Sequence, residues 1–208
     1  MKRLGILLSG RGSNFVAIAD AVRRHRLPGA EIAVVLSNKA DAAGLAIAQE
    51  RGLPAFAVPS AGRKRVEHDA EMIARLHQHK VDLVCLAGYM RVLSAEFVHA
   101  FPNQILNVHP SLLPSFPGLD AQAQALEFGA KVAGCTVHFV DEAVDHGATI
   151  VQRAVPVLDD DTVESLSARV LEQEHIAYPE AIARVLSGDF HFRGRRYVRR
   201  DQIRSSQE

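Results

Sequence analysis

The chain has 208 residues, 48% of them hydrophobic, and equal numbers of basic and acidic residues, 24 of each. This length suits one domain with a substantial core, and the apolar content excludes a disordered chain. The balanced charge provides no field that would recruit nucleic acid or an anionic membrane. No apolar run forms a signal peptide or approaches the roughly 18 residues of a membrane span, so we expect a cytoplasmic protein.

The two cysteines, Cys85 and Cys135, each lie in an apolar run that is typical of a buried strand. They have neither the spacing of a metal site nor the number expected of a disulfide scaffold. We expect both to be reduced core thiols. His77 and His79 are two residues apart on a predicted helix and do not share a face, so we expect no metal site.

In the first half of the chain, short apolar runs alternate with helical patterns. Strands are predicted at 4–8, 32–36, 54–58, 81–87 and 105–108. Helices are predicted between them, after residue 12 and over 41–52, 64–79 and 94–100. This alternation with short connections predicts right-handed crossovers and a mostly parallel sheet.

The pattern changes after residue 118. A short helix over 121–128 precedes two β-rich runs, 132–140 and 149–157, which predict an antiparallel pair or a strand–loop–strand excursion. A long helix is predicted over 162–186, with Thr162 as its cap and Pro179 as a kink or break. The following sequence, FHFRGRRYVRR, predicts an edge strand.

We therefore predict one α/β domain over 1–208, with a Rossmann-like, mostly parallel sheet, helices on both faces and an antiparallel C-terminal part. Residues 1–100 would form a phosphate-binding half and residues 101–190 a catalytic half. Residues 191–208 would form a tail. Its arginines could touch phosphates, although a solvated or self-packed tail is favoured because the whole chain is neutral.

Residues 105–118 are the strongest candidate for the chemistry. A buried strand, ILNV, runs into a loop with three prolines and a glycine in nine residues, which cannot be regular structure. Asn107 and His109 are two apart, so their side chains point to the same face of a strand. Active sites of open α/β sheets lie outside the carboxyl ends of the strands. The alternative is that Asn107 satisfies a loop and His109 is a core histidine with a backbone partner.

A second candidate is the sequence SGRGSN at 9–14, between a predicted strand and helix. Its glycines allow close approach of a ligand, and free amides at a helix start suit an anion. The dinucleotide fingerprint fails because Phe15 replaces its third glycine, and no Gly-Lys-Ser/Thr marks a Walker loop. The loop predicts a monophosphate site, the alternative being a glycine turn followed by a Ser/Asn cap.

Asp145 is a third candidate, because a carboxylate beside an imidazole orients it and stabilises its charged form. Spacing alone does not select it. Asp141, Glu142 and Asp159 lie nearby, and all four could be solvated loop acids.

Five motifs together carry a family resemblance: SGRGSN, LAGYMRVL at 86–93, NVHPSLLPSFPG at 107–118, GCTVHFVDEAVDHG at 134–147 and QEH at 173–175. Over about residues 3–186 the chain resembles the phosphoribosylglycinamide formyltransferases, a branch of the folate-dependent formyltransferases. The resemblance implies the formyltransferase fold and formyl transfer from 10-formyltetrahydrofolate to 5-phosphoribosylglycinamide in purine biosynthesis. It implies no metal, and a monomer or weak homodimer.

The resemblance also implies roles for particular residues. Asn107 and His109 would stabilise the oxyanion, and Asp145 would support His109 and proton transfer. The ribonucleotide would contact Gly12, Ser13, Asn14 and Glu174. Folate would contact Arg65, Met90, Arg91, Val92, Leu93, Asn107, Asp141 and Asp145. Arg63 and Lys64 adjoin Arg65, so the basic folate contact is one of these three.

Two other functions compete with the transferase. A hydrolase releasing formate from the same folate would share the catalytic residues, and only the phosphate loop and Glu174 argue against it. A non-catalytic nucleotide-binding module would leave Asn107, His109 and Asp145 structural. The failed glycine fingerprint disfavours a dehydrogenase.

Overall fold

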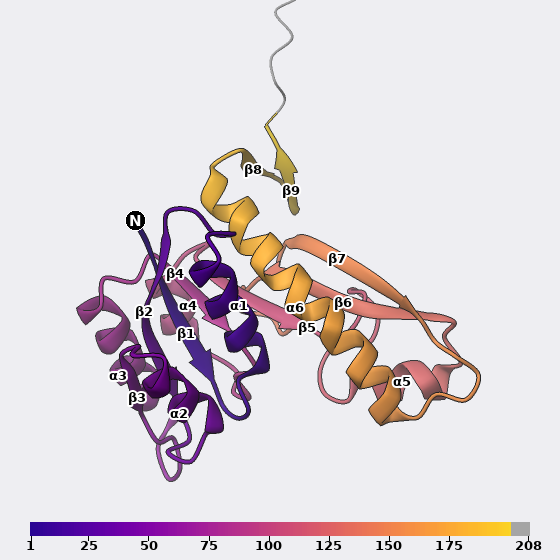
Figure 1. The fold of residues 1–208 in the computed structure, drawn as a ribbon, viewed down its shortest axis with the longest axis horizontal. Helices are drawn as coiled ribbons and strands as arrows, with labels where there is room; N and C mark the ends of the chain where they lie inside the picture. The colour runs from indigo at the N-terminus through magenta and orange to yellow at the C-terminus, as the bar shows by residue number, and fades with distance from the viewer. Residues whose placement is uncertain (201–208) are drawn as a thin grey trace, which may run out of the picture.

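The computed structural model describes residues 1–200, which form a seven-stranded sheet and a separate two-stranded hairpin (Figure 1). The main sheet has the order β3-β2-β1-β4-β5-β6-β7. Its strands are β1 (Lys2–Leu8), β2 (Ala30–Ser37), β3 (Ala55–Ala57), β4 (Leu83–Leu86), β5 (Ile105–His109), β6 (Val132–Phe139) and β7 (Thr149–Pro156). The first five are parallel, while β6 is antiparallel to β5 and β7 to β6. The predicted α/β architecture with an antiparallel C-terminal part is confirmed.

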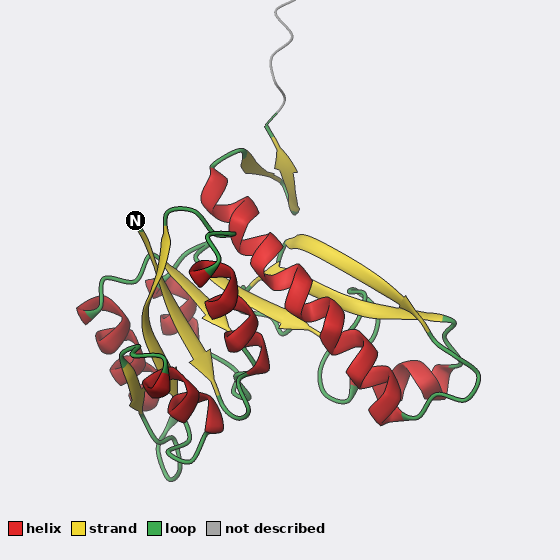
Figure 2. Cartoon of the chain, viewed as in Figure 1, coloured by secondary structure: helices red, strands yellow, loops and turns green. Residues whose placement is uncertain are grey.

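Helices cover both faces of the sheet (Figure 2). They are α1 (Ser13–Arg23), α2 (Ala43–Glu50), α3 (Arg65–Gln78), α4 (Ala95–Ala100), α5 (Ala121–Phe128) and α6 (Val163–Ser187). Alternating residues of β1 divide the core: Ile6 and Leu8 pack with α1, α2 and α6, whereas Leu7 packs with α3 and α4. Cys85 and Cys135 are buried free thiols, as predicted. Within residues 1–200, no helix is long and apolar enough to cross a membrane.

Helix α6 continues through Pro179, where the sequence predicted a kink or break. A proline in a helix removes one backbone hydrogen bond. Buried side chains on both sides of it, among them Tyr178 and Ala181, hold the helix against the sheet. Tertiary packing thus keeps one helix of 25 residues, which begins at the Thr162 cap and ends at Gly188, whose φ is +73°.

The predicted edge strand after α6 is wrong. Strands β8 (Phe190–Arg193) and β9 (Arg196–Arg199) pair with each other and, among the described residues, with no strand of the main sheet. A two-residue turn of Gly194 and Arg195 reverses the chain, and Gly194 supplies the positive φ that such a turn needs. Residues 201–208 of the predicted tail lie outside the described part of the chain.

Candidate active site

The candidate site lies at the carboxyl edge of the parallel strands, where the strand order changes direction. From β1 the chain proceeds outward to β2 and β3, and then returns to β4 and β5 on the other side of β1. Ligands of open α/β sheets bind at such a switch point. The Ser9 N–H donates to the Gly88 carbonyl at 3.0 Å, which joins the loops that follow β1 and β4.

The loop after β1 presents the start of α1 to this edge. Gly12 has a φ of +77°, and a Cβ at this position would lie 2.9 Å from the Cα of Gly44. The Gly44 N–H in turn donates to the Gly10 carbonyl at 3.0 Å. Among the described residues no side chain caps α1, so amides of its first turn are available to an anion.

Asn14 and Glu174 meet between α1 and α6. Asn14 Nδ2 donates to Glu174 Oε2 at 2.7 Å, and each residue is only 7% exposed. Burial raises the pKa of Glu174, and the bond from Asn14 opposes this shift. Asn14 Oδ1 is buried without a partner in the described part of the chain. The fold thus joins two predicted ribonucleotide contacts that are 160 residues apart.

His109, the last residue of β5, is buried between two acceptors. Its Nδ1 lies 3.3 Å from Asp145 Oδ2, and its Nε2 lies 2.9 Å from the Phe116 carbonyl oxygen. A ring protonated on both nitrogens donates to both of them. The structure therefore supplies the backbone partner of a structural histidine and, in addition, the carboxylate expected of a catalytic one.

Of the four acids named in the sequence analysis, Asp145 is the one that the fold places beside His109. It has a φ of +52°, and its Oδ2 also accepts the Gly118 N–H at 2.8 Å, so it links the proline-rich loop to loop 140–148. The other three face elsewhere: Asp141 contacts His146, Glu142 contacts His99, and Asp159 contacts Lys131.

His138 belongs to the same cluster, and the sequence analysis missed it. It lies opposite Asn107 in the β5–β6 pair, with its Nε2 at 3.4 Å from Asn107 Nδ2 and 3.8 Å from Asp145 Oδ1. Its Nδ1–H donates to the Phe139 carbonyl at 2.7 Å. Burial lowers the pKa of His138, with the backbone bond opposing, so the ring is neutral at neutral pH. The sequence contained one indication of this role: His138 is a histidine at a position of β6 whose side chain points inward.

Residues 90–93, the predicted folate segment, follow β4 at the same edge. Met90 is 70% exposed and Val92 49% exposed, whereas Leu93 is buried. The Met90 N–H donates to Ser9 Oγ at 2.8 Å. Arg91 has a buried Nε with no partner in residues 1–200. The segment therefore offers apolar surface and an unused donor.

The remaining predicted folate contacts stand apart from this cluster. Arg65 is exposed at the start of α3, while the neighbouring Arg63 is paired with Glu71 at 2.8 Å. No hydrogen bond or ion pair among residues 1–200 joins Arg65 or Asp141 to His109 or Asp145.

Two further features bear on ligands. A cavity of about 740 Å³ lies between α1 and α6 and is lined by Arg11 and Ser13, but not by the residues around His109. Across residues 1–200, no group of three or more His, Cys, Asp and Glu side chains could hold a metal ion.

Comparisons with known proteins agree on one family. The formyl transferase family model matches residues 2–182. The chain is 43% identical to the phosphoribosylglycinamide formyltransferase of Escherichia coli, covering 86% of this chain and 84% of that protein. It is 48% identical to the trifunctional purine biosynthetic protein adenosine-3 of Drosophila melanogaster, but spans only 14% of its length.

Solved structures give the same result. A glycinamide ribonucleotide transformylase 1 from Symbiobacterium toebii matches with a TM-score of 0.93 and 52% identity, covering 97% of this chain and 95% of that one. A formyltetrahydrofolate deformylase from Pseudomonas syringae matches with a TM-score of 0.89 and 26% identity, covering 96% and 66%.

Proposed function

The chain belongs to the formyl transferase family, and we propose that it transfers the formyl group of 10-formyltetrahydrofolate to the amine of 5-phosphoribosylglycinamide, a step of purine biosynthesis. One observation supports this most directly: His109 lies against Asp145, and His138 lies between Asp145 and Asn107, at the same sheet edge to which the loop after β1 leads. We also propose that the protein is cytoplasmic and is a monomer or weak homodimer.

The ribonucleotide would bind along the start of α1. Its phosphate would accept hydrogen bonds from the amides and side chains of Gly12, Ser13 and Asn14, where the helix dipole favours an anion. Its ribose hydroxyls would donate to Glu174, and a hydroxyl could also donate to the unpartnered Asn14 Oδ1. A nucleotide held in this way directs its amine toward the end of β5.

Folate would bind across residues 90–93. The exposed side chains of Met90 and Val92 provide apolar surface for an aromatic ring, and Arg91 Nε supplies a donor. Exposed Arg65 suits a carboxylate at the far end of the cosubstrate. Asp141 and Asp145 would approach from loop 140–148 on the other side.

In the reaction, the amine nitrogen forms a bond to the formyl carbon, and negative charge develops on the formyl oxygen. The Asn107 amide and the His109 imidazolium are the donors for this oxyanion. As the bond to the folate nitrogen breaks, that nitrogen takes up a proton and the amine loses one. Asp145, 3.3 Å from His109 Nδ1, orients the ring, stabilises the charge of the imidazolium in the transition state, and passes the proton, directly or through water.

The His109 geometry adds one requirement. Its Nε2–H donates to the Phe116 carbonyl in the free protein, so that donor is occupied. The oxyanion must therefore replace this carbonyl, which requires the proline-rich loop to shift when both substrates are bound. Asn107 needs no such change, because its amide has a second N–H.

Formate release by hydrolysis is the alternative, since the deformylase shares this fold. The Gly12 loop and Glu174 favour the transferase, because a hydrolase of folate alone would have no use for a phosphate site. The test is a spectrophotometric assay of 10-formyl folate with and without the ribonucleotide. Turnover that requires the ribonucleotide supports the proposal. Equal turnover without it would establish a hydrolase, and no turnover in either case would favour a binding module.

A further inference from the structure

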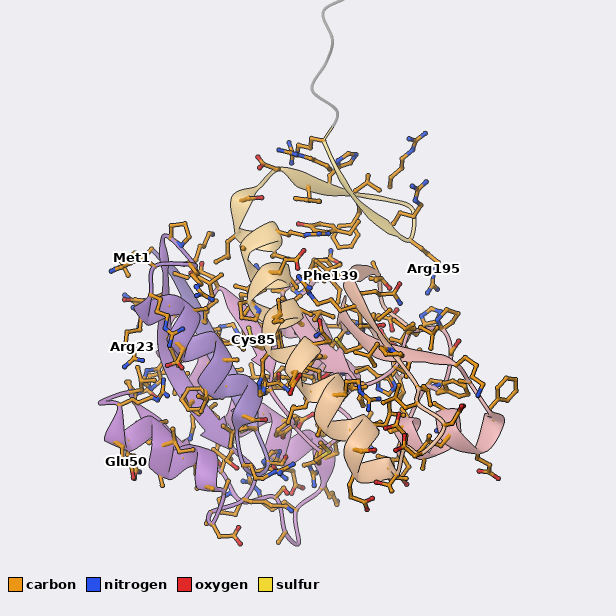
Figure 3. The ribbon with its side chains drawn as sticks, turned by 45° about the vertical axis from the view of Figure 1, so that its right-hand side comes forward. Met1, Arg23, Glu50, Cys85, Phe139 and Arg195 are labelled. Carbon is orange, nitrogen blue, oxygen red and sulfur yellow. The ribbon has the colours of Figure 1, made fainter. Side chains whose placement is uncertain are left out.

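Two contacts of the hairpin β8–β9 bear on loop 140–148, which carries Asp145: one is at Phe139, just before the loop, and the other is at His146 within it. We propose that this hairpin clamps the loop, and that Arg195 at its turn is a positioning residue for Asp145. The inference rests on the proposed function, because it assigns the hairpin a role in the same reaction. Figure 3 shows Phe139 beneath the hairpin and Arg195 at its tip.

The first contact is an aromatic cluster around Phe139, the last residue of β6. Its ring centroid lies 4.9 Å from that of Phe192 and 5.0 Å from that of Tyr197. Phe190 stacks on Tyr197 at 5.5 Å. Aromatic pairs at such distances are stabilising beyond the area they bury. The cluster therefore fixes the hairpin to the residue where loop 140–148 begins.

The second contact is made by the Arg195 guanidinium to His146, within the loop. Its Nη2 donates to the His146 carbonyl at 2.6 Å, and its Nη1 contacts Nε2 of the His146 ring. The Nδ1 of His146 lies 2.8 Å from Asp141 Oδ2. With Nδ1–H given to Asp141, Nε2 accepts from Arg195, so the three side chains form a continuous chain of hydrogen bonds.

The backbone of loop 140–148 is constrained near these two contacts. The Phe139 N–H donates to the Ala148 carbonyl at 2.9 Å and closes the neck of the loop. A Cβ at Gly147 would lie 1.8 Å from the Phe139 carbonyl oxygen, so the chain packs directly on the end of β6. Asp145 has a φ of +52°, which its surroundings must hold.

Arg195 thus acts on the residue that follows Asp145 and not on the reacting atoms. When that contact is lost, loop 140–148 samples conformations in which Asp145 does not face His109. The enzyme then works only in the fraction of molecules with the correct loop, and turnover falls to that fraction of its original value. The ribonucleotide contacts at Gly12 and Glu174 lie outside the loop and should be unaffected.

The test is the steady-state kinetics of Arg195→Ala in the full chain. Loss of a charge-assisted hydrogen bond should lower kcat about five- to twenty-fold while the ribonucleotide KM changes less than about twofold. Arg195→Lys should recover part of the loss. Arg193→Ala is the matched control, because this exposed arginine of the same hairpin lies outside the contact and should leave kcat unchanged.

A double-mutant cycle distinguishes failure of the clamp proposal from failure of the proposed function. If Arg195 acts through Asp145, adding Arg195→Ala to Asp145→Asn should cause little further loss. A normal kcat for Arg195→Ala, or the same loss in both backgrounds, would overturn the clamp. A normal kcat for Asp145→Asn would overturn the proposed role of Asp145 instead. Phe192→Ala, at a ring that is 39% exposed, should show the same kinetic loss with a folded circular dichroism spectrum.

Discussion

Glu174, the proposed ribose contact, reduces the stability of the free protein at neutral pH. Its carboxylate is buried, with Asn14 as its hydrogen-bond partner, and burial raises its pKa above the ordinary 4.5. A carboxyl whose pKa is raised by folding stabilises the native state at low pH, and this contribution is lost as the pH rises through the folded-state pKa. At neutral pH the charge therefore opposes folding.

We predict that Glu174→Gln is more stable than the wild type at pH 7.5, because it removes a buried charge and keeps an oxygen acceptor for Asn14. The gain should disappear as the pH falls to 4.5 and below, where the wild-type group is protonated in both states. Denaturation midpoints at the two pH values provide the measurement. The variant should also bind the ribonucleotide more weakly. A variant less stable than the wild type at pH 7.5 would show that the Glu174 charge does not oppose folding.

Single residues of the site differ in how far the sequence could predict them. The spacing of Asn107 and His109 on a strand is sufficient to place them on one face. Asp145 could not be separated from Asp141 or Glu142 by spacing, because the choice depends on a loop with a positive φ. His138 required the register of β6 against β5, which is a non-local pairing.

Among the elements, α1 depends on the loop that precedes it. Gly12 combines a φ of +77° with a close approach to Gly44, so a side chain there meets both backbone strain and a steric clash. The loop and the start of α2 are consequently held together, and the amides of α1 are fixed in direction.

We predict that Gly12→Ala lowers the free energy of unfolding by about 1–3 kcal/mol from backbone strain, with an added cost from the clash. The ribonucleotide KM should rise at least about tenfold, while the folate KM stays nearly constant, because the amide donors move. Gly29→Ala is the matched control: its φ is +75°, but a Cβ there meets nothing within 4 Å. Kinetics and urea unfolding of both variants provide the comparison, and equal ribonucleotide KM values would refute the role of the loop.

The elements themselves followed from periodicity where local sequence and packing agree. The parallel strands and their helices were predictable because buried strands give unbroken apolar runs and amphipathic helices repeat every 3.6 residues. The continuation of α6 through Pro179 and the pairing of β8 with β9 were not predictable from periodicity. The first depends on contacts that hold α6 together, and the second on a short ribbon that pairs with itself.

At the scale of the whole molecule, Tyr178 joins α6 to the centre of the sheet. Its hydroxyl is fully buried and lies 3.0 Å from the Leu86 carbonyl and 2.9 Å from the Leu106 carbonyl. These carbonyls are in β4 and β5, the strands that lead to the proposed folate segment, residues 90–93, and to His109. The Tyr178 side chain therefore links α6 to both β4 and β5.

We predict that Tyr178→Phe destabilises the protein by about 1–3 kcal/mol, because the two buried carbonyls lose a donor. The ring still fills its space, so the effect should be seen in thermal unfolding with kcat reduced less than about threefold. Tyr197→Phe, at a half-buried tyrosine of the hairpin, is the control and should leave stability nearly unchanged. Equal stability of the two variants would show that the Tyr178 hydroxyl does not hold the sheet.

In the proposed mechanism the Asp145 carboxylate acts on the reaction through His109 and not on ribonucleotide binding. The most direct test is Asp145→Asn, with kcat from the folate assay and ribonucleotide affinity from calorimetry, beside the exposed control Asp160→Asn. We predict a kcat lower by about 10²- to 10⁴-fold with affinity changed less than about twofold. A large loss of affinity with unchanged turnover would show that Asp145 serves ribonucleotide binding and not the reaction.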